Sequence, residues 1–179
     1  WKRKAKNEAW LPGETISASI GQGYVNVTPL QMASLIGTVA NDGVMFRPRL
    51  VQSVMDRATG ELQQRTAVPK RTLKLRPEIL PLIKEALVGV VQEGTATRAK
   101  SALVTIAGKT GTAQMTALHT GPEKDIPKKF RDHAWFGAFA PGDAPTRAVA
   151  VWGERMGHGG SASAPLAKEL IETYVKLNL

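Results

Sequence analysis

The chain of 179 residues contains no cysteine. This absence excludes disulfide bonds and thiolate metal sites, but it does not assign a cellular compartment. No run of about 18 apolar residues occurs, so the sequence predicts no membrane-spanning helix within these residues. The opening stretch WKRKAKNEAW does not resemble a secretory signal and has no initiator methionine. We therefore expect this chain to be a piece of a longer polypeptide.

Aromatic residues are also scarce, at 6% of the chain, and they lie in apolar segments rather than among lysines and arginines. A platform for single-stranded nucleic acid needs aromatic side chains within a basic groove, so we expect no nucleic-acid partner. The net charge is nevertheless +9, with basic clusters in residues 2–6, 65–76 and 124–131. Each cluster is either solvated surface or part of a polyanion-binding face. A basic polyanion- or nucleic-acid-binding domain therefore stays open as the alternative function.

Histidine is rare as well, with only His119, His133 and His158 spread along the chain. Zinc sites need three or four ligands close together, and without cysteine this set is too small and too scattered. We expect no metal site and no cofactor. Asp132 beside His133 is interpreted as a loop pair, because neighbouring side chains usually point apart.

Hydrophobic residues make up 42% of the chain, enough for one folded domain with a real core. Thr28 and Gln31 form a capping-box pattern, and Pro29 suits the first helical position, so we predict a helix from Thr28 to about Asn41. Gly43 is a fitting end for this helix. A second helix is predicted from Pro77 to about residue 94.

The remaining pattern predicts an antiparallel sheet with helices packed on it, an α+β fold. Residues 134–141 and 146–154 read as two apolar strands joined by a short turn, so they must be antiparallel. Residues 1–15 read as turn-rich, 15–24 as an extended segment entering a loop, 49–65 as a hairpin, 66–76 as a basic linker, 102–114 as a strand and 115–133 as a polar connection. The expected core aromatics are Trp135, Phe136, Phe139 and Trp152, and the stripe of the last helix, expected on the sheet, is Leu166, Leu170, Ile171, Tyr174 and Val175.

The most informative stretch is IAGKTGTAQ, residues 106–114. A phosphate-binding loop would need a glycine five residues before the Gly-Lys pair, where this chain has Leu103. That interpretation fails, since the intervening residues are typical of a strand. A strand edge carrying Lys-Thr-Gly-Thr offers backbone groups to an extended peptide and a cation with two hydroxyls to a carboxylate.

Lys-Thr-Gly is one of the motifs of penicillin-binding proteins and β-lactamases. Together with its neighbours it resembles the transpeptidase domain of class B penicillin-binding proteins, of the elongation type of Gram-negative bacteria. The resemblance covers nearly the whole chain and rests on AGKTGTAQ, SIGQGYVNVTPLQMA, NDGVMFRPRLV, AWFGAFAP and GHGGSASAP. It implies the penicillin-binding protein/β-lactamase-like fold, with an antiparallel sheet, helices on both faces, and three of the five central strands supplied by this chain.

The resemblance assigns roles to residues 109–114. It implies that Lys109 lies beside the nucleophile and helps to hold the carboxylate of a D-alanyl-D-alanine terminus, together with the Thr110 and Thr112 hydroxyls. Gly111 lets the substrate approach the strand, because it has no side chain. The Thr112 backbone N–H would be an oxyanion-hole donor, worth about 3 kcal/mol in the transition state. Ala113 and Gln114 are expected to bind substrate.

Two loop residues are further candidates for substrate binding. His158 follows the third strand in a glycine-rich loop, which is either near the cleft or only a connection. Tyr24 follows Gly21-Gln22-Gly23 and either approaches the site or packs elsewhere.

The nucleophile of this family is missing from the chain. None of the seven serines is followed by lysine at the third place or by asparagine at the second. By resemblance both motifs precede residue 1, so residues 1–179 are expected to be the C-terminal part of a single transpeptidase domain. We expect this fragment alone to be inactive and to expose apolar surface on its last helix and strands.

The function implied is that of a peptidoglycan D,D-transpeptidase, a serine acyl-transferase that cross-links stem peptides during cell elongation and is acylated by β-lactam antibiotics. The implied location is the periplasmic face of the bacterial inner membrane, with the anchor helix outside this chain. The implied partners are stem peptides, β-lactams, the N-terminal part of the same domain (in the same or a second chain), a glycan polymerase and other proteins of the elongation machinery.

Overall fold

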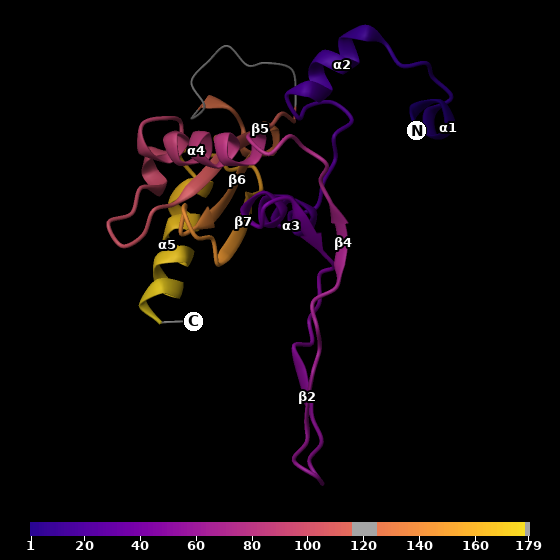
Figure 1. Cartoon of the computed structure of the whole chain (residues 1–179). Coiled ribbons are helices and arrows are strands. Elements are labelled where there is room, and N and C mark those ends of the chain that lie inside the picture. The colour runs from indigo at the N-terminus through magenta and orange to yellow at the C-terminus, as the bar shows by residue number, and fades with distance from the viewer. Residues whose placement is uncertain (116–124, 178–179) are drawn as a thin grey trace.

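The computed structural model describes residues 1–115 and 125–177, and it places a three-stranded sheet between helices (Figure 1). Two shorter two-stranded sheets lie outside this central one. Among the described residues, no helix combines the length and apolarity needed to cross a membrane. The elements are α1 Lys2–Lys6, α2 Pro12–Ser19, α3 Pro29–Ala40, β1 Val44–Phe46, β2 Ser53–Met55, β3 Leu62–Gln64, β4 Pro69–Thr72, α4 Ile79–Gln92, η1 Thr97–Ala99, β5 Ala107–Ala113, η3 Lys128–Phe130, β6 His133–Ala140, β7 Arg147–Gly153 and α5 Ser163–Lys176.

The central sheet has the strand order β5-β6-β7, and both pairings are antiparallel. The register places Gly111 opposite Trp135, and Trp135 opposite Trp152. The antiparallel arrangement of the two apolar strands, predicted from their short connection, is confirmed. Within the described part of the chain, β5 and β7 are the outer strands, so each has one edge without a strand partner.

Helices cover both faces of this sheet, as expected for the α+β fold. On one face, Phe136 of β6 is fully buried against residues of α4 and α5, including Val91 and Ala164. On the other face, Phe139 of the same strand is fully buried against Ile36 of α3. Because successive residues of a strand point to opposite faces, β6 contributes side chains to the hydrophobic core on each face of the sheet.

The start and the end of helix α3 are determined by residues at its own termini. The Thr28 hydroxyl accepts a hydrogen bond from the Gln31 backbone N–H at 3.2 Å, and the Gln31 side chain accepts one from the Thr28 N–H at 2.8 Å. This reciprocal pair satisfies two donors that the first helical turn leaves without partners. Gly43 follows the helix with φ 85°, a conformation that favours glycine. The predicted start and end of this helix are confirmed.

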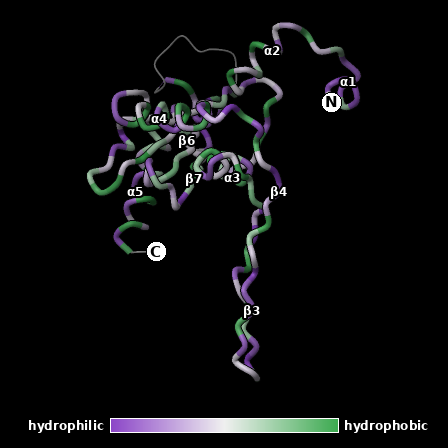
Figure 2. The backbone as a smooth tube through the Cα atoms, viewed as in Figure 1, coloured by the Kyte–Doolittle hydropathy of each residue, from purple (hydrophilic) through white to green (hydrophobic). Residues whose placement is uncertain are grey.

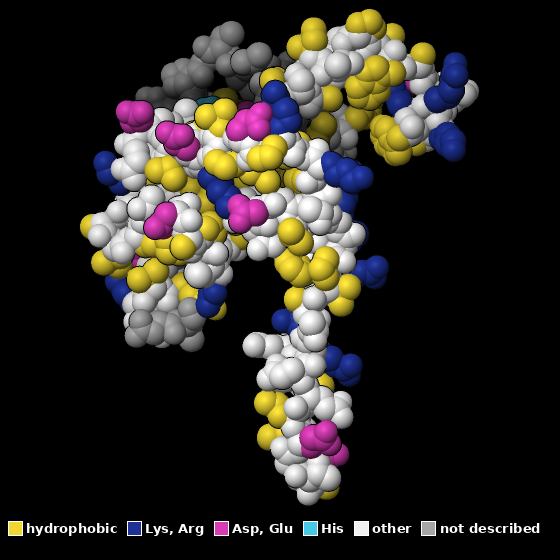
Figure 3. Space-filling view, viewed as in Figure 1, with side chains coloured by type: hydrophobic (Ala, Val, Ile, Leu, Met, Phe, Trp, Pro, Cys, Tyr) yellow, Lys and Arg dark blue, Asp and Glu magenta, His cyan; other side chains and the backbone are white. Residues whose placement is uncertain are grey.

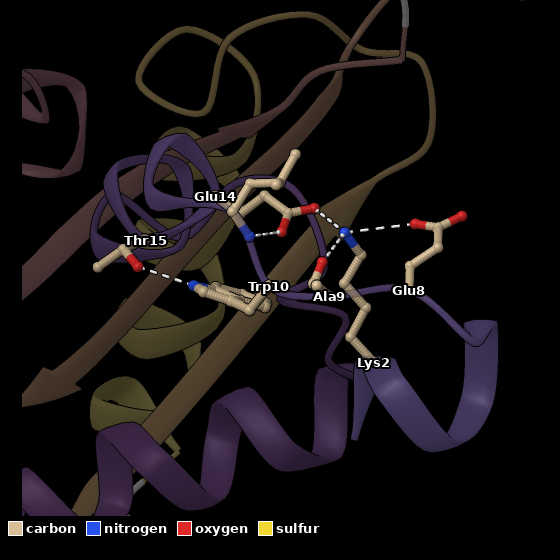
Figure 4. A network of polar contacts seen from close by, with 7 residues as sticks. Lys2, Glu8, Ala9, Trp10, Glu14 and Thr15 are labelled. Atoms are coloured by element: carbon tan, nitrogen blue, oxygen red, sulfur yellow. Dashed lines mark hydrogen bonds and ion pairs between the residues drawn. The ribbon is translucent and has the colours of Figure 1, made fainter.

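The N-terminal segment is helical, so the prediction of a turn-rich start and an extended stretch over 15–24 was wrong. Pro12 occupies the first turn of α2, and the Glu14 carboxylate accepts a hydrogen bond from the Leu11 N–H at 2.7 Å. Proline is favoured at that position because its nitrogen has no hydrogen to satisfy. Lys2 joins this start to α1, since its ammonium contacts Glu14 at 2.5 Å and the Ala9 carbonyl at 2.9 Å (Figure 4).

The predicted hairpin is present, and it forms a narrow ribbon that projects from the body (Figure 1). Asp56 closes its turn by accepting hydrogen bonds from the Ala58 and Thr59 backbone N–H groups. All residues of β2 and β3 are exposed, and the ribbon carries both hydrophobic and hydrophilic segments (Figure 2). In this view basic side chains lie on the part of the ribbon nearer the body, whereas acidic ones lie toward its tip (Figure 3).

The prediction of a linker over 66–76 was wrong in part, because Pro69–Thr72 forms strand β4. This strand pairs with β1, where Val44 lies opposite Thr72 and Met45 opposite Arg71. The strand was not predicted because its basic residues are also typical of a solvated linker. Helix α4 confirms the second predicted helix, with its first residue at Ile79 rather than at Pro77.

Helix α5 lies on the sheet, but with a different face from the one predicted. Its buried residues are Ser163, Ala164, Ala167 and Ile171, so of the predicted stripe only Ile171 is buried. Small alanine side chains let the helix approach the strands closely, and the larger apolar residues then point to the side. Leu170 is 56% exposed and Tyr174 40% exposed. Trp152, predicted as a core residue, is 43% exposed.

Candidate active site

Strand β5 carries the Lys-Thr-Gly-Thr motif along an outer edge of the central sheet. Lys109 is exposed, and it pairs with Gly137, where an added Cβ would lie 2.8 Å from Ile36 of α3. Thr110 pairs instead with Phe136, which packs toward α5. The lysine and the two threonines of the motif therefore project from opposite faces of the sheet at the same edge.

The backbone carbonyl groups of Thr110 and Thr112 point toward the open edge of β5, away from β6. The Thr112 carbonyl accepts a hydrogen bond from Gln22 Nε2 at 2.8 Å, and the Thr110 carbonyl accepts one from Lys109 Nζ at 3.0 Å. In an antiparallel strand the N–H and C=O of one residue point to the same side. The Thr112 N–H therefore also faces the open edge, where a strand-like ligand could pair with it.

A polar pocket lies beside the threonines. It is lined by three short segments of the chain: residues 95–98, which lead into η1, part of β5, and the loop before α5. The lining residues are Thr95, Thr97, Arg98, Thr110, Thr112, His158, Gly159, Gly160 and Ser161. No Asp or Glu is in this set, and Arg98 supplies a positive charge. The pocket therefore offers hydroxyl groups and a cation, the donors that suit a carboxylate.

The loop before α5 lies close to the sheet and to Thr95 only because Gly159 and Gly160 have no side chains. A Cβ added to Gly159 would lie 2.1 Å from the Trp135 carbonyl oxygen and 2.6 Å from that of Gly111. One added to Gly160 would lie 2.3 Å from the Thr95 carbonyl oxygen. These distances are far below ordinary contact, so the loop can lie against the sheet here only without side chains.

The structure brings most of the predicted site residues together. Thr110, Thr112 and His158 line one pocket. On β5, Gly111 lies between the two threonines and Lys109 directly precedes Thr110. Ala113 ends the strand opposite His133, and Gln114 follows it as an exposed residue.

Tyr24 is not among the residues that line this pocket. Its ring packs against Trp1 at 5.6 Å and Trp10 at 6.4 Å between centroids, and Lys2 Nζ lies 5.5 Å from its centroid. Of the two interpretations left open by the sequence, this placement favours packing.

Asp132 and His133 each accept a hydrogen bond from a backbone N–H group. Asp132 accepts a hydrogen bond from the Met115 N–H at 3.0 Å, and His133 Nδ1 accepts one from the Arg155 N–H at 2.9 Å. Both contacts tie loops to the start of β6. His119 lies outside the described residues. Within residues 1–115 and 125–177, no group of three or more His, Asp or Glu is placed to hold a metal ion.

Sequence reasoning missed three residues of this site. Gln22 lies 90 residues before Thr112 and Thr95 lies 15 residues before Thr110, so their contacts with β5 do not follow from the local sequence. Arg98 lies in η1 and reaches the site through the glycine loop. Arg98 Nη1 donates a hydrogen bond to the Ser161 carbonyl at 3.3 Å, which joins the η1 segment to the glycine loop.

Comparison with known proteins agrees with this geometry. Residues 2–172 match the family model described as the penicillin binding protein transpeptidase domain. The chain belongs to the penicillin-binding protein transpeptidase family. Its fold is accordingly the one expected from the resemblance, with the Lys-Thr-Gly strand at the edge of an antiparallel sheet.

Among curated members of this family, the chain is similar to peptidoglycan D,D-transpeptidase MrdA of Acinetobacter baumannii, with 37% identity over 98% of this chain and 26% of that protein. Against MrdA of Haemophilus influenzae the identity is 33%, over 100% of this chain and 28% of that protein. The chain thus spans about a quarter of the length of these curated penicillin-binding proteins.

Solved transpeptidase structures are similar too. Pseudomonas aeruginosa PBP2 in complex with WCK 5153 gives a TM-score of 0.78 at 33% identity, covering 97% of this chain and 35% of that one. The complex between Helicobacter pylori PBP2 and MreC gives 0.77 at 28% identity, covering 99% and 30%. The ceftriaxone acyl-enzyme of penicillin-binding protein A from M. tuberculosis gives 0.71 at 34% identity, covering 87% and 34%.

Proposed function

We propose that this chain is the C-terminal part of the catalytic domain of a peptidoglycan D,D-transpeptidase that acts in cell elongation. The observation that carries this proposal is the open edge of β5, where Lys-Thr-Gly-Thr lies beside a pocket rich in hydroxyl groups. The relatives named MrdA support the reaction, and the family match over residues 2–172 favours it over a polyanion-binding domain.

In the proposed reaction a serine hydroxyl, supplied by polypeptide outside this sequence, attacks the carbonyl carbon between the two terminal D-alanines. The tetrahedral intermediate collapses to an acyl-enzyme, and the terminal D-alanine leaves with the proton that the serine gave up. An amine of a neighbouring stem peptide then attacks the ester, restores the serine and forms the cross-link. β-Lactams acylate the same serine.

This chain contributes binding and charge stabilisation to that reaction. We infer that the Thr112 N–H donates to the developing oxyanion, since it faces the open edge of β5. The Thr110 and Thr112 hydroxyls hold the terminal carboxylate within the pocket they line, and the glycine loop with His158 closes one side. Lys109 leaves the strand on the other face, and its ammonium returns to the edge at the Thr110 carbonyl. We infer that this ammonium lies beside the serine in the complete domain.

The domain is proposed to be completed by polypeptide outside residues 1–179, in the same or a second chain. Two features support this: the outer edge of β7 has no strand partner in the described part of the chain, and α5 exposes Leu166, Leu170 and Tyr174 beside it. Two additional strands would satisfy the edge and cover these side chains. Because the nucleophilic serine of the proposed reaction lies outside this sequence, we expect this chain alone to be inactive.

The proposed setting is the periplasmic face of the inner membrane, among elongation-machinery proteins and a glycan polymerase. The complex of a PBP2 with MreC in Helicobacter pylori supports a partner of this kind, and the ceftriaxone acyl-enzyme of penicillin-binding protein A supports β-lactams as ligands.

Labelling of the intact protein with fluorescent penicillin tests the proposal. We expect a covalent band that benzylpenicillin abolishes, and a band at least tenfold weaker in Lys109→Ala. Lys74→Ala, which removes an exposed lysine from the segment after β4, is the matched control and should label normally. No band from the intact protein would contradict the proposed function, and full labelling of Lys109→Ala would contradict the role of Lys109.

A further inference from the structure

A hydrogen bond between two threonine hydroxyls links the Lys-Thr-Gly strand to the segment after α4. Thr95 Oγ1 lies 2.8 Å from Thr110 Oγ1, and both residues line the polar pocket. Thr110 is the middle residue of the motif, whereas Thr95 lies between the end of α4 and η1. The contact therefore joins a residue of the proposed carboxylate site to a residue outside every motif of the sequence.

The backbone holds Thr95 firmly at this place. The next residue, Ala96, is fully buried in the core, and its N–H donates to the Val90 carbonyl at 3.0 Å. In the same peptide group the Thr95 carbonyl lies against Gly160, which has no room for a side chain. On the other side of Thr95, the Gly94 N–H donates to the Gly89 carbonyl at 3.1 Å. Because the chain is fixed before and after it, the Thr95 hydroxyl is presented to Thr110 without the ordering cost of a mobile loop.

The direction of this hydrogen bond follows from the ligand chemistry. A hydroxyl has one hydrogen to donate, and a carboxylate can only accept. When Thr110 donates its hydrogen to a carboxylate in the pocket, its oxygen must serve as the acceptor toward Thr95, so Thr95 donates. Lys109 Nζ, 3.5 Å from Thr110 Oγ1, can also only donate. Both neighbours thus direct the Thr110 hydrogen into the pocket.

We propose that Thr95 is a positioning residue for the donor peptide: it fixes the Thr110 hydroxyl in the orientation that binds the terminal carboxylate. Without Thr95, the Thr110 hydroxyl is free to rotate toward nearby backbone groups, as threonine hydroxyls commonly do. Arg98 contributes the positive charge on the same wall of the pocket, which favours an anionic ligand. The inference rests on the proposed transpeptidase function.

The test compares Thr95→Val, which removes the hydroxyl at nearly constant volume, with Thr95→Ser, which keeps it. The second-order rate constant of acylation is measured on the intact protein with benzylpenicillin and with its methyl ester, which lacks the charged carboxylate. We expect Thr95→Val to be acylated about tenfold more slowly by benzylpenicillin, the effect of one hydrogen bond to a charged ligand. Thr95→Ser should stay within about twofold of the unchanged protein, and the ester should not distinguish the three proteins.

The ester separates positioning from a general structural effect. A Thr95→Val protein that loses the same factor with the acid and the ester would overturn the positioning role, since damage to the fold affects both ligands. Unchanged acylation of Thr95→Val by benzylpenicillin would overturn it as well. If the intact, unsubstituted protein is acylated by neither ligand, the proposed function fails, and the role of Thr95 fails with it.

Discussion

Gln22 donates a hydrogen bond from Nε2 to the carbonyl oxygen of Thr112, 2.8 Å away, from a loop 90 residues earlier in the chain. That carbonyl lies on the open edge of β5, where an added peptide strand would place its own N–H. The glutamine side chain therefore occupies an acceptor that a bound peptide needs. Because a carbonyl oxygen has two lone pairs, a bound peptide either displaces Gln22 or shares this acceptor with it.

Removal of this competing donor should favour ligands that carry an amide N–H. We expect Gln22→Ala, in the intact protein, to raise the acylation rate constant by about two- to tenfold, the worth of a typical hydrogen bond. Gln22→Met should behave alike, because its uncharged side chain has a similar length but cannot donate a hydrogen bond. Acylation kinetics with a β-lactam that has an acylamino side chain provide the measurement, and Gln63→Ala on the exposed ribbon is the control. Slower acylation of both Gln22 variants would contradict this account.

Gly159 is predicted to be the least tolerant glycine of the site. A methyl group there would meet the backbone oxygens of Trp135 and Gly111 at 2.1 and 2.6 Å, and backbone cannot move aside as a side chain does. We expect Gly159→Ala to destabilise the intact protein by about 3 kcal/mol and to abolish penicillin labelling. Gly13 has no atom within 4 Å of an added Cβ, so Gly13→Ala is the matched control. Urea unfolding measures both variants, and equal stability of the two would refute the packing argument.

The contacts that define the site explain how far the sequence could predict it. The cap of α3 was predictable because Thr28 and Gln31 are three residues apart and contact each other locally. The antiparallel pair β6 and β7 was predictable because a short turn allows no other arrangement. The pairs Gln22–Thr112 and Thr95–Thr110 were not, since their partners lie 90 and 15 residues apart and come together only through the tertiary structure.

Two predictions were wrong because the sequence pattern fits more than one structure: the start of the chain and the buried face of α5. Pro12 suits both a turn and the first turn of a helix, and the Glu14 carboxylate that decides between them acts on the Leu11 N–H. In α5 the large apolar residues suggested the buried face, whereas Ala164 and Ala167 occupy it. The position of the helix depends on how closely it approaches the sheet, which periodicity does not specify.

The N-terminal arm, residues 1–19 with helices α1 and α2, should become less ordered in acid. The backbone N–H of Leu11 and then the Lys2 ammonium hold the pKa of Glu14 below its usual 4.5, and Glu14 in turn raises the pKa of Lys2. A lowered carboxyl pKa stabilises the ordered arm above pH 4.5, and this contribution is lost as the pH falls through the lowered value. Because the pKa of Lys2 is raised, the contribution of this ion pair to the order of the arm is lost only when the pH rises above 10.5, the usual pKa of the lysine.

Tryptophan fluorescence measures this transition, because Trp10 Nε1 donates to Thr15 within the same arm at 2.8 Å (Figure 4). We expect a change in emission as the pH falls below 4.5. In Glu14→Gln this change should be absent, since the neutral amide does not titrate. An identical acid transition in Glu14→Gln would assign the signal to other carboxyls.

Leu170 provides the sharpest test of whether further polypeptide covers α5. It lies between two apolar hollows, one lined by Val149 and Tyr174 and the other by Val151 and Leu166. In this chain Leu170 is 56% exposed, and Leu62 on the projecting ribbon is 53% exposed. If two additional strands cover the hollows, Leu170→Ala should cost the intact protein about 2–5 kcal/mol, as for a buried leucine. Leu62→Ala should cost less than about 0.5 kcal/mol, as for a surface residue. Urea unfolding of the two variants separates the cases, and equal small losses would mean that α5 faces solvent in the intact protein as well.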